Sequence, residues 1–178
     1  ISIMSELRTN RIVPRDGLTS GTGIGGGIIQ VKSTTKTDVF TTDSTSLVDV
    51  TGLSVTITPT RSDSKILVMT TVNAGTDTAN FMYMQIVRDS TDIFRGDAAG
   101  SRPRRSGMYY NASNTGRNNT ISITHMDEPA TTSATTYKIQ IECATSGNAY
   151  VNRSSRDTDG SGYDARLASS ITVMEVSG

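Results

Sequence analysis

Strict alternation of apolar and polar residues is the feature that most constrains the fold of this chain. In residues 53–58 the odd positions are Leu, Val and Ile, and the even positions are Ser or Thr. Residues 137–143 repeat the pattern, with Tyr, Ile, Ile and Cys on one phase. Because successive strand residues point to opposite faces, such segments bury one face and expose the other. They predict antiparallel sheets with one face on the core and a solvent-exposed outer face.

Short segments of this kind recur from residue 28 to the end. No stretch longer than about two turns has apolar residues at helical spacing between a cap and a glycine. Ser and Thr make up more than a quarter of the chain, which favours half-exposed strands and polar turns. We predict an all-β protein with a jelly-roll-like antiparallel β-sandwich of roughly eight to ten strands. The other expected strands are residues 28–31, 38–42, 46–50, 66–72, 81–87, 108–111, 120–126, 149–152 and 170–176.

Residues 66–72 and 81–87 are apolar on both phases. Strands of this type are covered on one face by the core and on the other by a second surface. Another subunit is one source of that surface, and a segment of the same chain is the alternative.

The first 27 residues differ from the rest. Residues 5–27 have neither a helical nor a strand period and end in a Gly-rich run at 21–27. That run matches G-x-G-x-x-G, but a dinucleotide site needs a strand before it and a helix after it, and here a strand is expected to follow. We interpret residues 1–27 as an extended arm with a hinge and residues 28–178 as the sandwich, and Met4 is a plausible natural start.

Composition excludes several classes of protein. Lys plus Arg and Asp plus Glu both number 17, so no global charge favours nucleic acid or an anionic membrane. No apolar run is long enough to cross a bilayer, and no export signal is recognisable. The single cysteine, Cys143, lies at an apolar-phase position and is expected in the core rather than as a reactive thiol.

An arginine cluster with adjacent tyrosines is the candidate ligand-contact loop. Guanidinium groups can bind phosphate or acidic sugar, although a solvated loop or an intersubunit ion-pair cluster is the simpler explanation of them. Tyrosine rings suit sugar stacking, and strand alternation should turn one of the pair inward. The candidate residues are Arg102, Arg104, Arg105, Tyr109 and Tyr110.

Two further features offer weaker chemistry. The loop from Asp157 to Asp164 contains three carboxylates that could gather Ca²⁺, but Asp, Gly and Ser are also ordinary turn residues. His125 has acidic neighbours at positions 127 and 128, yet no nucleophile or second histidine accompanies it. We expect His125 to be structural, and we expect no catalytic residue, metal or cofactor.

Five segments, residues 53–59, 64–68, 87–90, 129–137 and 170–176, resemble a recurrent domain of tailed-phage virion proteins, especially those of cyanophages and other marine phages. Residues 7–12, the Gly-rich run and residues 28–31 are similar to the opening of many phage fibre proteins. The resemblance implies a jelly roll like the globular heads of tumour necrosis factor or complement, which commonly form homotrimers.

The resemblance implies a virion protein, made in the host cytoplasm, that works as a trimeric tail or fibre component in host-surface attachment. A head decoration or tail-connecting protein without a receptor is the alternative, because fold analogy does not settle function. The arm would dock on another virion protein, with Leu7, Asn10, Ile12 and Pro14 as candidate contacts. A host glycan is the possible ligand, whereas nucleic acid and membrane insertion are not expected.

Overall fold

The chain folds entirely into β-strands and connecting loops. A computed structural model describes residues 27–77, 79–112, 116–160 and 164–178, and within these ranges no residue is helical, so no helix there could span a membrane. The all-β prediction is confirmed. The strands are β1 (Ile28–Lys36), β2 (Phe40–Thr42), β3 (Val48–Ile57), β4 (Lys65–Thr76), β5 (Asn80–Arg88), β6 (Thr91–Ile93), β7 (Gly107–Asn111), β8 (Asn119–Asp127), β9 (Thr135–Cys143), β10 (Ala149–Val151) and β11 (Ser169–Val176).

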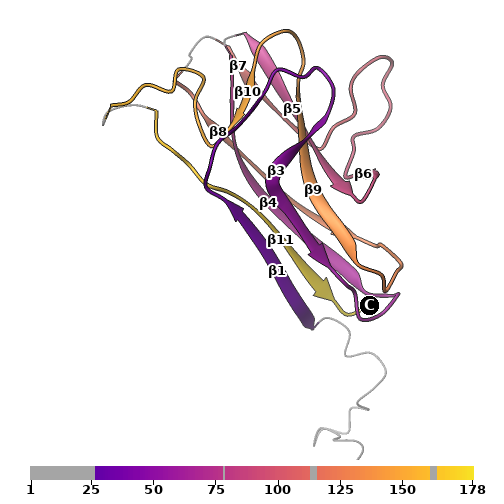
Figure 1. The fold of residues 1–178 in the computed structure, drawn as a ribbon. Helices are drawn as coiled ribbons and strands as arrows, with labels where there is room; N and C mark the ends of the chain where they lie inside the picture. Colours follow the sequence, from indigo (N-terminus) through magenta and orange to yellow (C-terminus); the bar gives the residue numbers. More distant parts are fainter. Residues whose placement is uncertain (1–26, 78, 113–115, 161–163) are drawn as a thin grey trace, which may run out of the picture.

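The strands form two antiparallel sheets that face each other (Figure 1). Sheet A runs β1-β11-β4-β8, and the short strands β10 and β2 extend it beside the end of β4. Sheet B runs β3-β9-β5, and β5 pairs with β7 along its first half and with β6 along its second half. This arrangement confirms the predicted sandwich.

The order of the eight longest strands is that of a jelly roll. Numbered in sequence, the first pairs with the eighth, the eighth with the third and the third with the sixth in sheet A. In sheet B the second pairs with the seventh, the seventh with the fourth and the fourth with the fifth. Each sheet therefore mixes strands from both halves of the chain, as two interleaved Greek keys require.

Strand β3 joins two segments that the sequence pattern separates. Residues 46–50 and 53–58 alternate on different phases, so they read as two strands. The structure makes them one strand with a register shift between Asp49 and Ser54, where Gly52 has a positive φ of 81°. A glycine accepts this backbone conformation without a steric penalty, and the irregularity restores an inward side chain at Leu53.

The core lies between the sheets and consists mainly of aliphatic side chains. Every strand of more than five residues except β1 contributes at least two buried apolar residues, on alternate positions. Cys143 is 1% exposed and belongs to this core, as predicted. The largest fully buried apolar side chains are Tyr137, Leu53, Ile57, Ile66, Met82, Met84, Ile86, Ile139, Ile141 and Ile171.

Glu175 is a charged residue inside this structure. Its side chain accepts hydrogen bonds from the Gln30 amide (2.7 Å) and from both the backbone N–H and the hydroxyl of Thr60 (2.7 Å each). Burial by itself raises the pKa of this carboxyl, but the hydrogen bonds outweigh burial and lower the pKa to about 2. Glu175 thus ties β11 to β1 and to the loop before β4.

The two ends of the sandwich differ in what they carry. Ser177 donates its backbone N–H to the carbonyl of Gly27 (3.1 Å), so the start of β1 and the C-terminus lie together at one end (Figure 1). The end of β4 and the start of β5 lie at the opposite end, together with β10 and the loop that precedes β11. A segment that precedes residue 27 therefore joins the domain far from the β4–β5 turn.

Candidate functional site

The outer face of sheet B carries a cluster of exposed aromatic side chains. Phe81 and Tyr83 of β5 lie opposite Tyr110 and Met108 of β7 in the strand register. We call these four residues the aromatic ladder. Met108 is 54% exposed and Tyr110 is 45% exposed, while Phe81 and Tyr83 are half-buried.

The rings of the ladder stack on one another. The Phe81 and Tyr110 ring centroids are 4.3 Å apart with an interplanar angle of 24°, and those of Phe81 and Tyr83 are 6.2 Å apart at 8°. Cross-strand aromatic pairs of this kind stabilise a sheet and restrict the rotamers of the rings. The ring conformations in the ladder are therefore coupled to one another and restricted.

The neighbouring tyrosines of β7 point in opposite directions, as strand alternation predicts. Tyr109 is 7% exposed and packs in the core, where burial raises the pKa of its phenol. Of the two tyrosines only Tyr110 presents its ring to solvent. The sequence singled out this pair but not Phe81 or Tyr83, which join Tyr110 only through strand pairing.

An ion pair borders the ladder. Glu142 of β9 lies opposite Tyr83, and its carboxylate accepts two hydrogen bonds from the Arg105 guanidinium, from Nη2 at 2.6 Å and from Nε at 2.9 Å. Arg105 also donates to the carbonyl of Arg104 at 2.9 Å. The Glu142 side chain is 8% exposed and that of Arg105 is 21% exposed, so this pair is shielded more than a surface salt bridge.

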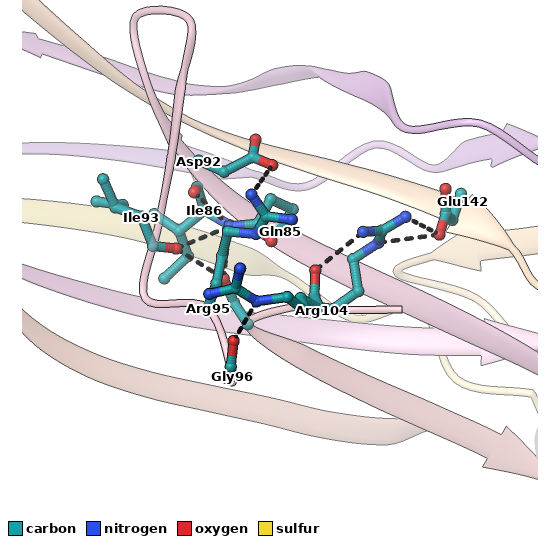
Figure 2. Close-up of polar contacts among 10 residues, drawn as sticks. Gln85, Ile86, Asp92, Ile93, Arg95, Gly96, Arg104 and Glu142 are labelled. Carbon is teal, nitrogen blue, oxygen red and sulfur yellow. Dashed lines mark hydrogen bonds and ion pairs between the residues drawn. The ribbon is translucent and has the colours of Figure 1, made fainter. Parts of the chain in front are cut away.

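The other arginines of the predicted ligand loop contact their own loop. Arg104 donates to the carbonyl of Gly96 at 2.6 Å, as Figure 2 shows, and Arg102 donates to the carbonyl of Ala99 at 3.4 Å. Arg95 pairs with Asp92 at 3.5 Å. The structure thus brings Arg105 next to the ladder, while Arg102 and Arg104 lie in the loop that follows β6.

This loop also covers part of β5. The side-chain amide of Gln85 donates to the carbonyl of Ile93 (2.7 Å) and to the hydroxyl of Ser106 (3.0 Å), which anchors both ends of the loop on sheet B (Figure 2). Gln85 is fully buried, although it points away from the core. For this part of β5 the second covering surface is a segment of the same chain.

The outer face of sheet A has a different composition. Its central positions form rows across four strands in the order β1, β11, β4 and β8. The rows contain Ser, Thr, Met, Leu and Val and no charged residue, and we call them the uncharged face. They are Val31-Met174-Leu67-Met126, Ser33-Thr172-Met69-Thr124 and Thr35-Ser170-Thr71-Ser122.

The uncharged face is open to solvent in the isolated chain. Val31 is 50% exposed, Met69 40% and Met126 41%, and Leu67 and Met174 are half-buried. Unlike Gln85 in β5, these side chains of β4 and its neighbours are not covered by a loop of the described residues. The outward side chains of residues 66–72, such as Leu67 and Met69, are thus not covered by any other segment of the described part of the chain.

The acidic loop before β11 uses its carboxylates in ion pairs. Asp157 pairs with Arg153 (3.0 Å) and Arg166 (2.7 Å), and Asp164 pairs with Arg156 (2.7 Å). Hydrogen bonds from Arg156 and Ser154 hold the pKa of Asp164 well below its usual range. Within the described residues no group of three or more His, Cys, Asp or Glu side chains is placed to hold a metal ion.

His125 and Cys143 have structural surroundings. The His125 ring lies 5.0 Å from that of Phe94, while the nearby carboxylates pair elsewhere, Asp127 with Arg88 and Glu128 with Lys65. Burial raises the pKa of Cys143 to about 11, so its thiol stays protonated near neutral pH. The proposed arm contacts Leu7, Asn10, Ile12 and Pro14 lie outside the described residues.

Comparisons with known proteins give limited information. No protein-family model matches the chain, and no curated protein matches it. Among solved structures, the chain is similar to a chain in the structure of the infectious bursal disease virus Gx strain. The identity is 13% and the TM-score 0.42, over 83% of this chain and 41% of that one. It is also similar to the VP2 subviral particle of infectious bursal disease virus, at 14% identity and a TM-score of 0.42, over 84% and 42% of the two chains. The chain spans less than half the length of these structures, and the likeness carries no conclusion about function.

Proposed function

We propose that this protein is a structural subunit of a phage virion that acts without catalysis, assembles as a homotrimer and serves in attachment to the host surface. The observation that carries the proposal is the uncharged face of sheet A. The sequence resemblance to phage fibre proteins supports the virion setting, and the jelly-roll strand order is compatible with it.

The uncharged face has the properties of a buried contact. Its first row sets Val31, Met174, Leu67 and Met126 side by side across four strands. Contiguous exposed apolar patches are uncommon on monomeric proteins and often mark interaction sites. Burial of such side chains releases about 25 cal/mol per Å² of apolar surface, and no charge has to be desolvated.

A second copy of the chain is the partner that fits this face. The face offers no charge to recognise a charged partner, whereas contact between different patches of identical chains closes a ring when the rotation from copy to copy closes. The adjoining edge of the domain exposes Phe94 (44%), whose ring lies 5.0 Å from that of His125 of β8, and this ring supplies an apolar counterpart on the neighbouring copy. The threefold closure itself follows from the resemblance.

Analytical ultracentrifugation of the full chain tests the assembly. The unmodified protein should sediment as a trimer, and Met69→Glu should sediment as a folded monomer, because Met69 is exposed enough for the isolated domain to tolerate a charge. Ser54→Glu is the matched control, since Ser54 is an exposed position of β3 on the other sheet and should leave the trimer intact. A monomeric unmodified chain, or a trimeric Met69→Glu variant, would contradict the proposal.

Attachment is favoured over decoration by the opposite orientation of the two outer faces. If the uncharged face is buried between copies, the aromatic ladder on sheet B remains at the surface. It also lies toward the end of the domain away from Gly27, where the arm joins. Immunogold labelling of virions should place the protein at fibre or tail tips, whereas label spread over the head would favour decoration.

A further inference from the structure

We infer that the aromatic ladder is a binding site for an uncharged hexose unit of a host-surface carbohydrate. The inference deepens the proposed function and rests on it only for the exposure of the ladder on the virion. Binding itself is a property of the purified chain.

Ring chemistry is the first step of the argument. Sugars present apolar C–H faces and hydroxyl edges, and a tyrosine ring presents an apolar face with a polar edge. Phe81 and Tyr110 stack face to face, so each of these rings uses one face in the pair. Tyr110 is the exposed ring of the pair and presents its other face and its hydroxyl to a ligand, while Tyr83 adds a second hydroxyl on the far side of Phe81. This arrangement matches one sugar ring stacked on Tyr110.

The polar border supplies directional hydrogen bonds. Arg105 and Glu142 lie beside Tyr83, and their mutual hydrogen bonds hold both groups in fixed positions. A guanidinium has five N–H donors, and the hydrogen bonds to Glu142 and to the Arg104 carbonyl use three of them. Arg105 can therefore also donate to a sugar hydroxyl beside Tyr83. The pair carries no net charge, which favours an uncharged sugar over an acidic one.

The size of the ladder argues against a protein partner. Aromatic side chains have about 150–250 Å² of surface each, so three partly exposed rings and one methionine offer at most roughly 300–400 Å². A stable protein interface needs about 800 Å² from each partner. The ladder is therefore too small for a lasting protein contact, but it is large enough for a sugar.

The ladder is also prepared for binding. Its strands are paired in register from Asn80 to Met84, and the inward Tyr109 fixes β7 on the core. Stacking already restricts the rings, so a ligand does not have to immobilise free side chains. This lowers the entropic cost of binding a weak ligand, and a trimer would multiply the weak contacts.

Saturation-transfer NMR on the full chain tests the inference with maltohexaose, lactose and mannotriose as neutral probes and oligogalacturonate as the acidic probe. At least one neutral probe should bind, and Tyr110→Ala should weaken its binding about fivefold, because stacking on an exposed ring contributes roughly 1 kcal/mol. Met108→Glu should weaken it too, since it places a charge in the ladder while every ring remains. Val39→Ala shortens an exposed apolar side chain that lies outside both the ladder and the proposed subunit contact, and it should leave binding unchanged.

Three results would overturn the inference: no neutral probe binds, the Tyr110→Ala and Met108→Glu variants bind as well as the unmodified chain, or oligogalacturonate alone binds. Thermal unfolding and sedimentation of each variant separate these outcomes from a failure to fold or to assemble. A chain that binds sugar but stays monomeric would contradict the proposed assembly and leave the ladder site intact.

Discussion

On the outer face of sheet A, three rows of Ser, Thr, Met, Leu and Val lie side by side without a charge. On the outer face of sheet B, aromatic rings stand beside charged groups that are already paired, such as Arg105 with Glu142. Both faces expose apolar atoms, but only the second combines stacked aromatic rings with a shielded ion pair. A face of the first kind suits burial against another chain, whereas a face of the second kind suits a small polar ligand.

The difference shows how one fold separates assembly from recognition. Burial of an uncharged face costs little desolvation, and its stabilisation grows with area. Recognition of a sugar instead needs donors and acceptors that stay in place in water. A sandwich presents its two outer faces in opposite directions, so one can be covered while the other stays open.

Removal of the charged border of sheet B should have the largest effect. Glu142→Ala leaves the shielded Arg105 without its carboxylate, which should lower the free energy of unfolding by about 2 kcal/mol. For a domain of this size that corresponds to a fall in melting temperature of roughly 4–8 °C. Thermal unfolding checks it, with Glu128→Ala as the control, because the Lys65–Glu128 pair is exposed and should contribute almost nothing.

The hydrogen bonds of Glu175 should produce an acid-sensitive edge of sheet A. The folded pKa is about 2 and the usual value is 4.5, so the contribution is complete above about pH 4.5 and is lost as the pH falls toward 2. Glu175→Gln should lower stability at pH 7 by about 1–2 kcal/mol and have less effect at pH 2. Urea unfolding across this pH range checks the difference, and an equal loss of stability at both pH values would be inconsistent with it.

The extent of the covered surface on sheet A can be mapped with a charge in its polar rows. Ser170→Lys places a charge in the Ser and Thr row that is farthest from Leu67. If the subunit contact covers all three rows, the dissociation constant of the trimer should rise about tenfold, because the charge of the lysine must then be desolvated. If only the first rows are covered, sedimentation of Ser170→Lys should match that of the unmodified chain.

The smallest effect is expected for Tyr110→Phe, which tests whether the ring or the hydroxyl of Tyr110 contributes more to sugar binding. Tyr110→Phe retains the ring and removes one hydroxyl, so neutral-sugar binding should weaken about twofold, since a solvent-exposed neutral hydrogen bond contributes about 0.5 kcal/mol, the low end of the usual range. Saturation-transfer NMR on this variant beside Tyr110→Ala provides the comparison. A loss as large as that of Tyr110→Ala would assign the binding to the hydroxyl instead of the ring.

Much of the fold was predictable because alternation is local. Segments such as residues 53–58 and 137–143 reveal their inward residues without reference to any partner strand. Strand β6 escaped prediction because Thr91–Ile93 is too short to show a period. The single strand β3 escaped it because the irregularity at Gly52 shifts the phase of the alternation midway.

The candidate site was predictable only in part. The sequence singled out Tyr110 and Arg105, since aromatic and guanidinium groups stand out beside each other in the chain. It did not indicate that Phe81 stacks on Tyr110 or that Arg105 pairs with Glu142, because those residues come from other strands. The sequence also singled out the carboxylates of the acidic loop as possible Ca²⁺ ligands. In the structure Asp157 and Asp164 pair with arginines instead, and the sequence alone did not indicate these pairs.

The sequence by itself determined the all-β class and the inward phase of most strands, because these follow from the chemistry of neighbouring residues. Only the tertiary structure decided which outward side chains meet. Strand register is set by packing of the whole core and by bulges and turns, and it brings together residues far apart in the chain. The uncharged face and the aromatic ladder are therefore products of the jelly-roll pairing rather than of any local pattern.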